Sequence, residues 1–207
     1  MNVFMVLGFS NSFVLSTIHI MLPVYTHLTY RITVLGEHCI GLGTLSGIEK
    51  CTNLETFVVG ICKSLTDLSA LRSCTSLKHL ELSYCKLVSN LKRNDSLCTL
   101  KLEGLIRLTN LSGLEGSYSL HTVNILNCRN LVDFSHLETC RALHTLKISL
   151  CINTKEIRLP NERFSNYRLN TLEFKGACES LRTSEKVTKL YSQFAALRVL
   201  RINGIDF

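Results

Sequence analysis

Hydrophobic positions recur along the chain in a fixed unit of two parts. The unit reads L-x-x-L-x-L-x-x-C-x-x-L-x-x-L-x-x-L, where L is an aliphatic residue or Phe. In the first part apolar residues alternate, which is the spacing of a short strand with one buried face. In the second part they recur every third residue, which favours 3₁₀ or short helical turns because side chains at i and i+3 eclipse there. Each unit is therefore predicted to be one strand followed by one turn.

The unit repeats through most of the chain, at intervals of 23, 20, 23 and 23 residues. The five regular copies begin at Leu54, Leu77, Leu97, Leu120 and Leu143. Less regular copies precede Leu54 and begin at Leu169 and Leu197. A strand with one turn cannot bury its own apolar side, so the copies must stack and share one core. We predict an α/β repeat solenoid over residues 31–207, with about seven or eight units, a parallel sheet on the concave face and turns on the convex face.

Composition fits a single array of this kind. The chain has 207 residues, of which 46% are hydrophobic and 19% charged, and this excludes a disordered chain or a coiled coil. The net charge is +7, but the basic residues are dispersed and the longest basic run is Lys92-Arg93. A nucleic-acid-binding protein would gather Lys and Arg into a stripe or block. We therefore expect no nucleic-acid partner.

These units resemble the repeats of the leucine-rich repeat superfamily throughout residues 31–207. The segment Leu77-Lys-His-Leu-Glu-Leu-Ser-Tyr-Cys85 ends in Cys where many members have Asn, so the units look like a hybrid of the Sds22-like and cysteine-containing types. Together with turns such as Thr66-Asp67-Leu68-Ser69-Ala70-Leu71, this segment is most similar to the kinetoplastid leucine-rich repeat proteins. Comparable turns occur in bacterial internalin-like repeats. The resemblance implies a curved solenoid with the sheet inside the curve.

Eight of the ten cysteines fall into two repeat positions. One position holds Cys39, Cys62, Cys85, Cys128 and Cys151, and the other holds Cys51, Cys74 and Cys140. We interpret them as buried free thiols with weak hydrogen bonds, since cysteine without a disulfide is often buried. There is no C-x-x-C pair or Cys/His cluster at short spacing, so no metal is expected. Reduced thiols favour a cytoplasmic or nuclear protein.

Two segments depart from the unit. Residues 1–30 are apolar and carry no charged side chain, and we interpret them as a degenerate repeat or cap over the end of the core. The alternative is an export or anchor segment, which would make the protein secreted or membrane-associated; contact with a membrane is expected only through residues 1–24. Residues 152–168 contain Pro160 and several charges, and they are predicted to be an inserted surface loop.

Outward-facing strand positions are the candidate site. Between and beside the buried residues of each strand, polar and charged side chains recur in columns across the units. The predicted partner-binding residues on the concave face are His79, Glu81, Lys101, Glu103, Asn124, Lys147, Glu173, Lys175 and Arg201. Their charges alternate in sign from strand to strand, which suits one particular protein surface better than a polyanion. Ordinary solvated charge is the competing interpretation.

No catalytic motif supports an enzyme. The chain has no G-x-S-x-G, H-E-x-x-H or G-x-x-x-x-G-K-[ST] sequence, so we expect no catalytic residue, cofactor or small-molecule substrate. The resemblance to leucine-rich repeat proteins implies a non-enzymatic module, scaffold or adaptor, that binds a protein partner on the concave face. Two alternatives stay open: the substrate-recognition component of a ubiquitin ligase, and a surface receptor module if residues 1–24 are an export or anchor segment.

Overall fold

The computed structural model describes residues 2–7, 31–38, 41–151, 168–176, 183–194 and 196–207, and the structural statements below concern these residues. Most of the apolar segment 1–30 and nearly all of the predicted insertion 152–168 lie outside them, as do Cys39 and Cys178.

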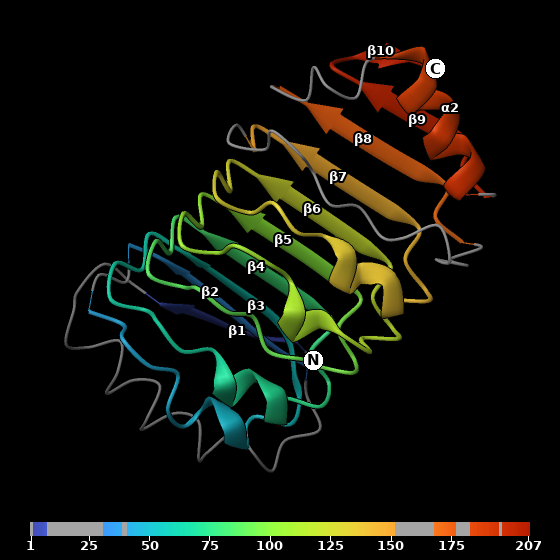
Figure 1. Cartoon of the computed structure of the whole chain (residues 1–207). Coiled ribbons are helices and arrows are strands. Elements are labelled where there is room, and N and C mark those ends of the chain that lie inside the picture. Colours follow the sequence, from blue (N-terminus) through green and yellow to red (C-terminus); the bar gives the residue numbers. More distant parts are fainter. Residues whose placement is uncertain (1, 8–30, 39–40, 152–167, 177–182, 195) are drawn as a thin grey trace.

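The described residues form one ten-stranded sheet whose strands follow one another in chain order (Figure 1). Each of the first eight strands pairs with the next in parallel, and the last strand is antiparallel to the ninth. The strands are β1 (Asn2–Leu7), β2 (Arg31–Glu37), β3 (Leu54–Gly60), β4 (His79–Ser83), β5 (Thr99–Glu103), β6 (Thr122–Leu126), β7 (Thr145–Ser149), β8 (Thr171–Lys175), β9 (Val199–Ile202) and β10 (Ile205–Asp206).

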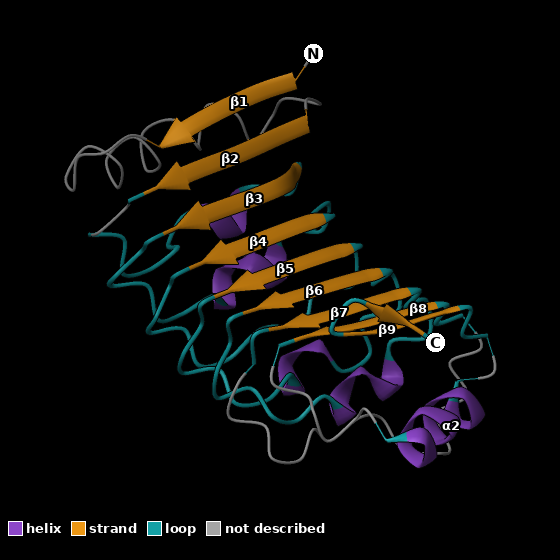
Figure 2. Cartoon of the chain, turned by 90° about the horizontal axis from the view of Figure 1, so that it is seen from above, coloured by secondary structure: helices purple, strands orange, loops and turns teal. Residues whose placement is uncertain are grey.

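Short helical segments cover one side of this sheet and leave the other side open (Figure 2). They are the 3₁₀ helices η1 (Ile48–Lys50), η2 (Ser69–Ser73), η3 (Ser112–Leu114) and η4 (Ser135–Thr139), and the α-helix α2 (Ser184–Gln193). The predictions of parallel strands and short 3₁₀ turns are confirmed, and the arrangement is the one expected of a repeat solenoid. No helix in the described parts of the chain has the length and apolar character needed to cross a membrane.

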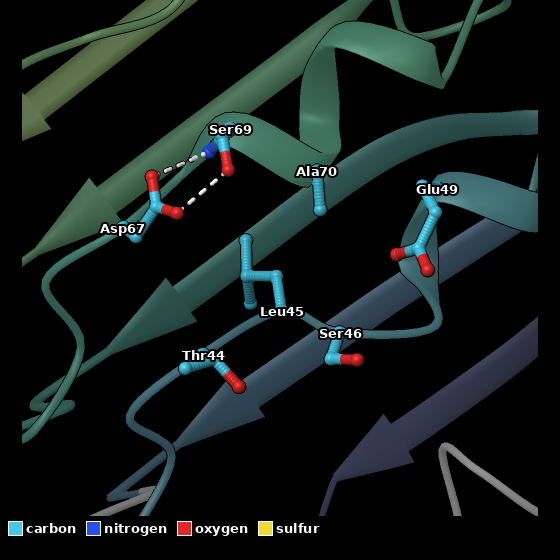
Figure 3. Close-up of a pocket in the computed structure, with 7 residues that line it drawn as sticks. All are labelled: Thr44, Leu45, Ser46, Glu49, Asp67, Ser69 and Ala70. Atoms are coloured by element: carbon cyan, nitrogen blue, oxygen red, sulfur yellow. Dashed lines mark hydrogen bonds between the residues drawn. The ribbon is translucent and has the colours of Figure 1, made fainter.

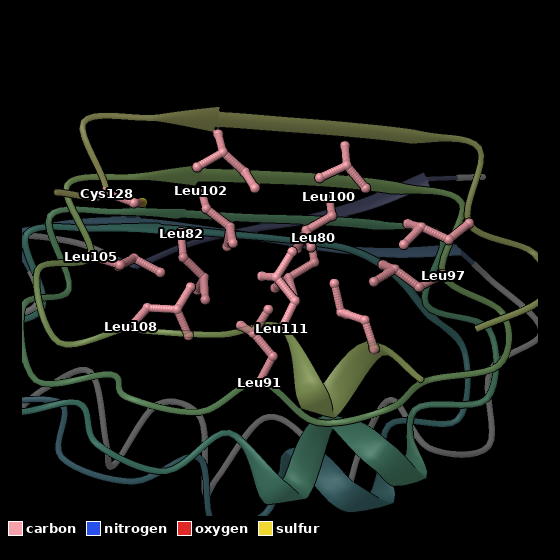
Figure 4. Packing of buried hydrophobic residues seen from close by; sticks show 14 of the residues in the cluster. Leu80, Leu82, Leu91, Leu97, Leu100, Leu102, Leu105, Leu108, Leu111 and Cys128 are labelled. Atoms are coloured by element: carbon pink, nitrogen blue, oxygen red, sulfur yellow. The ribbon is translucent and has the colours of Figure 1, made fainter. Parts of the chain in front are cut away.

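The core lies between the sheet and the turns, and it is continuous from unit to unit (Figure 4). In the ladder Leu80 lies beside Leu100 and Leu82 beside Leu102, and all four side chains are buried. Burying one such side chain contributes roughly 1.5–3 kcal/mol to the free energy of folding. Each apolar layer is thus covered by the layers of the neighbouring units, so no unit completes its own core.

A residue in the left-handed backbone conformation follows each strand from β2 to β9. The φ angles at this position lie between 53° and 75° in His38, Ile61, Tyr84, Gly104, Asn127, Leu150, Gly176 and Asn203. The N–H of Ile61 donates to the carbonyl of Ser83 at 2.8 Å, and equivalent bonds follow from unit to unit. This bond joins the end of one strand to the end of the next. Ile61 is a β-branched residue, for which positive φ is strained, so the ladder must hold it there.

Each described thiol of the first cysteine column donates a hydrogen bond within its own unit, and that of Cys85 also reaches the carbonyl of Val59 in the preceding unit at 4.0 Å. Cys62, Cys85, Cys128 and Cys151 each donate to the carbonyl two residues earlier, at 3.5–3.6 Å. None of the eight described cysteines is in a disulfide and seven of them are buried, which confirms for these residues the interpretation of the columns as buried thiols. Burial raises the pKa of Cys128 to about 11, so that thiol stays protonated at neutral pH.

Two residues of the second cysteine column, Cys74 and Cys140, tie their turns to the preceding ones. Cys74 donates to the carbonyl of Ile48 at 3.3 Å, and Cys140 bonds the preceding turn in the same way. Asn94 takes the place of a cysteine in the shorter unit, where its amide nitrogen donates to the carbonyl of Leu71 at 2.8 Å. The sequence pattern indicated only cysteines at this position. The sequence does contain a signal for this role of Asn94. Asn94 precedes Leu97 by three residues, just as Cys74 precedes Leu77 by three, so the two residues occupy equivalent positions in the repeat.

A β-hairpin follows the last long strand. Asn203 and Gly204 have φ angles of 54° and 81° and connect β9 to β10, as in a two-residue type I′ turn. The N–H of Phe207 then donates to the carbonyl of Leu200, so β10 lies along the edge of β9. The repeat pattern does not predict this strand, although Asn-Gly between apolar residues is a strong hairpin signal.

Close stacking of the turns gives the first prediction. A Cβ atom at Gly113 would overlap the backbone carbonyl group of Leu91 in the preceding unit. We expect Gly113→Ala to lower the free energy of unfolding by about 1–3 kcal/mol, because neither backbone can move without disturbing the stack. Chemical denaturation monitored by circular dichroism measures this.

The matched control is Gly43→Ala. There the nearest atom to a new Cβ is the carbonyl oxygen of Ser64 at 3.6 Å, an ordinary contact distance. We expect a change within about 0.5 kcal/mol. Equal effects of the two substitutions would show that the contact between Gly113 and Leu91 does not limit stacking.

Candidate functional site

The side of the sheet away from the turns carries three columns of outward-facing residues on β3 to β9, and we name this surface the open face. The amino-end column is Thr56, His79, Thr99, Thr122, Thr145, Thr171 and Val199. The central column is Val58, Glu81, Lys101, Asn124, Lys147, Glu173 and Arg201. The carboxyl-end column is Gly60, Ser83, Glu103, Leu126, Ser149 and Lys175. The structure thus brings all nine predicted site residues to one face, and their role in binding stays a prediction.

His79 is the one predicted site residue in the amino-end column. It is exposed and lies between Thr56 and Thr99. The remainder of that column, except for Val199, is threonine, whose branched side chains pair well across neighbouring strands. We therefore assign the charged part of the open face to the other two columns.

Ion pairs join neighbours along the central column. Lys101 lies 3.2 Å from the carboxylate of Glu81, and Lys147 lies 3.2 Å from the carboxylate of Glu173. Lys175 in the next column adds a second contact to Glu173, at 3.0 Å. Opposite charges side by side on a sheet are mutually stabilising. The charges of opposite sign that the sequence places on neighbouring strands therefore pair with each other within the molecule.

Glu173 differs from the other charged residues because it is buried. Its side chain is 8% exposed, whereas that of Glu81 is 39% exposed. Burial opposes ionisation of Glu173, but hydrogen bonds and charge from Lys175 and Lys147 together outweigh that effect, and the pKa of the carboxyl group is lowered. Glu173 is thus held as a carboxylate between two ammonium groups.

Asn124 occupies the centre of the open face, between Lys101 on β5 and Lys147 on β7. Its side-chain oxygen is shielded from solvent and has no hydrogen-bond partner among the described residues. A shielded acceptor of this kind costs free energy in the isolated chain.

An apolar rim borders the charged columns at the carboxyl ends of the strands. Leu126 is 37% exposed, and Tyr84 and Leu150, which follow β4 and β7, are 39% and 45% exposed. The hydroxyl of Tyr84 donates to the carboxylate of Glu103 at 2.7 Å, and this bond raises the pKa of Tyr84. Tyr84 and Leu150 were not predicted, because only strand positions were considered; their place directly before the column cysteines is the available signal.

Arg201 is the last charged residue of the central column. Its guanidinium group donates to the carboxylate of Asp206, which lies opposite it in the β9–β10 hairpin. The hydrogen bond and charge of Asp206 raise the pKa of Arg201. The hairpin therefore supplies a counter-charge that the repeat pattern does not assign to this face.

A cavity of about 320 Å³ lies on the turn side, between η1 and η2 (Figure 3). It is lined by Thr44, Leu45, Ser46, Glu49, Asp67, Ser69 and Ala70. Asp67 accepts hydrogen bonds from the N–H and the hydroxyl of Ser69, and Glu49 accepts one from the N–H of Gly47. Both carboxylates are used in holding the turns. Nowhere in the described chain do three His, Cys, Asp or Glu side chains gather in a way that could hold a metal ion.

Neither a scan against models of known protein families nor a search of curated proteins found a match for this chain.

The two lysines of the central column give the second prediction. Lys147→Gln leaves buried Glu173 with one partner, and we expect it to lower the free energy of unfolding by about 1–3 kcal/mol at pH 7. Lys101→Gln makes the same change in the same column, but the side chain of its partner Glu81 is 39% exposed, so we expect no more than about 0.5 kcal/mol. Urea denaturation of both variants measures the difference, and equal losses would contradict the burial of Glu173.

The dependence on pH gives the third prediction. Because the pKa of Glu173 is lowered in the folded state, the stability it contributes is complete above the unfolded value of about 4.3 and is lost as pH falls through the folded value. The loss of stability in Lys147→Gln should therefore shrink between pH 7 and pH 3. A loss that stays constant over this interval would show that ionisation of Glu173 is not the cause.

Proposed function

We propose that this chain is a leucine-rich repeat protein that binds a protein partner across its open face and catalyses no reaction. The regular apolar unit, the in-phase parallel ladder, the short turns on one side and the buried thiol after each strand support assignment to that superfamily. The open face corresponds to the concave face expected of such a solenoid. The buried cysteines, none of which is in a disulfide among the described residues, support a cytoplasmic or nuclear location.

The main observation in support of protein binding is the extent of the open face. Its amino-end and central columns run without interruption over seven neighbouring strands, from β3 to β9, and its carboxyl-end column runs over six, from β3 to β8. Stable protein interfaces use about 20–30 residues from each partner, and the three columns hold a similar number. Charged, hydroxyl and apolar side chains are mixed on this face, as they are at interfaces between proteins.

Affinity capture with matched variants tests the proposal and is the fourth prediction. The tagged full chain is used to capture partners from its native cells, beside Lys101→Glu with Leu126→Asp, which reverses one charge and removes one apolar group on the open face. The control is Arg72→Glu with Ile106→Asp, which makes the same changes on η2 and in the loop after β5. Mass spectrometry quantifies the recovered proteins.

We expect a stoichiometric partner with the wild type and the control, and a loss of at least about tenfold with the open-face variant, because like charges across an interface are strongly unfavourable. All three chains should unfold at similar denaturant concentrations. A partner retained equally by the open-face variant would refute binding at this face. Recovery of a ubiquitin ligase core with the chain would identify it as a substrate-recognition component.

A further inference from the structure

The charges of the open face are distributed unevenly between its two halves. The charged side chains on β4, β5, β7 and β8 are, in chain order, Glu81, Lys101, Glu103, Lys147, Glu173 and Lys175. The half formed by β4 and β5 has two carboxylates and one ammonium group, so its net charge is −1. The half formed by β7 and β8 has two ammonium groups and one carboxylate, so its net charge is +1. The open face is thus polarised across the strands.

Burial makes this polarity stronger at the surface that a partner meets. Glu173, the carboxylate of the basic half, is almost inaccessible, whereas its partners Lys147 and Lys175 are 46% and 59% exposed. In the acidic half Glu81 is 39% exposed and pairs with Lys101, which is 51% exposed, and Glu103 is half-buried and accepts a hydrogen bond from the hydroxyl of Tyr84. A partner therefore meets two ammonium groups on one half, and two partly accessible carboxylates beside one ammonium group on the other.

An apolar side chain separates the two halves. Leu126 on β6 lies in the carboxyl-end column between Glu103 on β5 and Ser149 on β7, and Lys175 on β8 follows. From β5 to β8 the carboxyl-end column therefore presents an acidic, an apolar, a small and a basic side chain in that order. Neighbouring strands lie about 4.8 Å apart, so Glu103 and Lys175 are about 14 Å apart across the sheet.

We infer that the open face binds a polypeptide segment that crosses the strands with a basic residue over β5, an apolar residue over Leu126 and an acidic residue over β8. This rests on the proposed function, because it specifies the partner of the same face. An extended chain rises about 3.3 Å per residue, so the basic and acidic residues are about four positions apart, with the apolar residue between them. The charges of this segment complement those of the two halves, and its apolar residue covers Leu126.

Selection from a displayed library of random 15-residue peptides tests this pattern on the full chain. Peptides are kept when they bind the wild type and the control Ile106→Asp but not Leu126→Asp; Ile106 is an apolar residue of similar exposure outside the open face. Circular dichroism checks that both variants are folded. The retained peptides should share a Lys or Arg and an Asp or Glu about four positions apart, with an apolar residue between.

Rescue by charge reversal then identifies the pairing. One retained peptide is synthesised, and its dissociation constants are measured by fluorescence anisotropy. Replacing its basic residue by Glu should weaken binding to the wild type at least tenfold, and Glu103→Lys should restore most of that loss. Lys175→Gln, a change at the other half, should restore none of it.

The outcomes separate this inference from the proposed function. Peptides that depend on Leu126 but lack the charge pattern, or that Glu103→Lys does not rescue, overturn the inference and leave protein binding at the open face standing. Failure to obtain any peptide whose binding depends on Leu126 overturns the inference, whereas the proposed function is decided separately by the capture experiment with Lys101→Glu and Leu126→Asp.

Discussion

Each strand of this sheet pairs sideways with the equivalent strand of the next unit, and this in-phase ladder is the constraint on which the other features depend. Because lateral hydrogen bonds join residues at the same unit position, every side chain stands about 4.8 Å from its equivalents in the neighbouring units. Residues of the same kind at the same unit position therefore form columns across the units. Thiols line the core, left-handed residues end the strands, and charges run across the open face, all for the same geometric reason.

The shorter unit shows how strong this constraint is. The copy that begins at Leu77 has 20 residues where its neighbours have 23, yet Leu80 still lies beside Leu100 in the ladder. No 3₁₀ helix is described between β4 and β5, so the missing residues come from the turn and not from the strand. The shortening is accommodated on the turn side of the sheet, where Gly113 of the following turn lies directly against the backbone of Leu91.

Periodicity predicted the fold well because it reports burial, and burial fixes the strand positions. The core leucines, the thiol columns and the placement of the nine site residues on one face all follow from counting positions in the unit. The repeat pattern does not predict how two residues of the same charge in one column differ in their contribution to stability. Lys101 and Lys147 occupy the same column, but only the partner of Lys147 is buried, and that burial depends on how β8 and its neighbours cover Glu173. The hairpin that brings Asp206 to Arg201 likewise joins residues outside the repeat pattern.

The position of Asn94 has a consequence for covalent modification. Asn94-Asp95-Ser96 has the form of an N-glycosylation acceptor, which oligosaccharides reach through the side-chain amide nitrogen. In the folded chain Asn94 is buried, and that nitrogen donates to the carbonyls of Leu71 and Cys74. A sugar attached there would replace one of the two amide hydrogens, remove at least one of these bonds and force adjacent turns away from each other. A glycan on Asn94 would thus mark a molecule modified before its repeats had stacked.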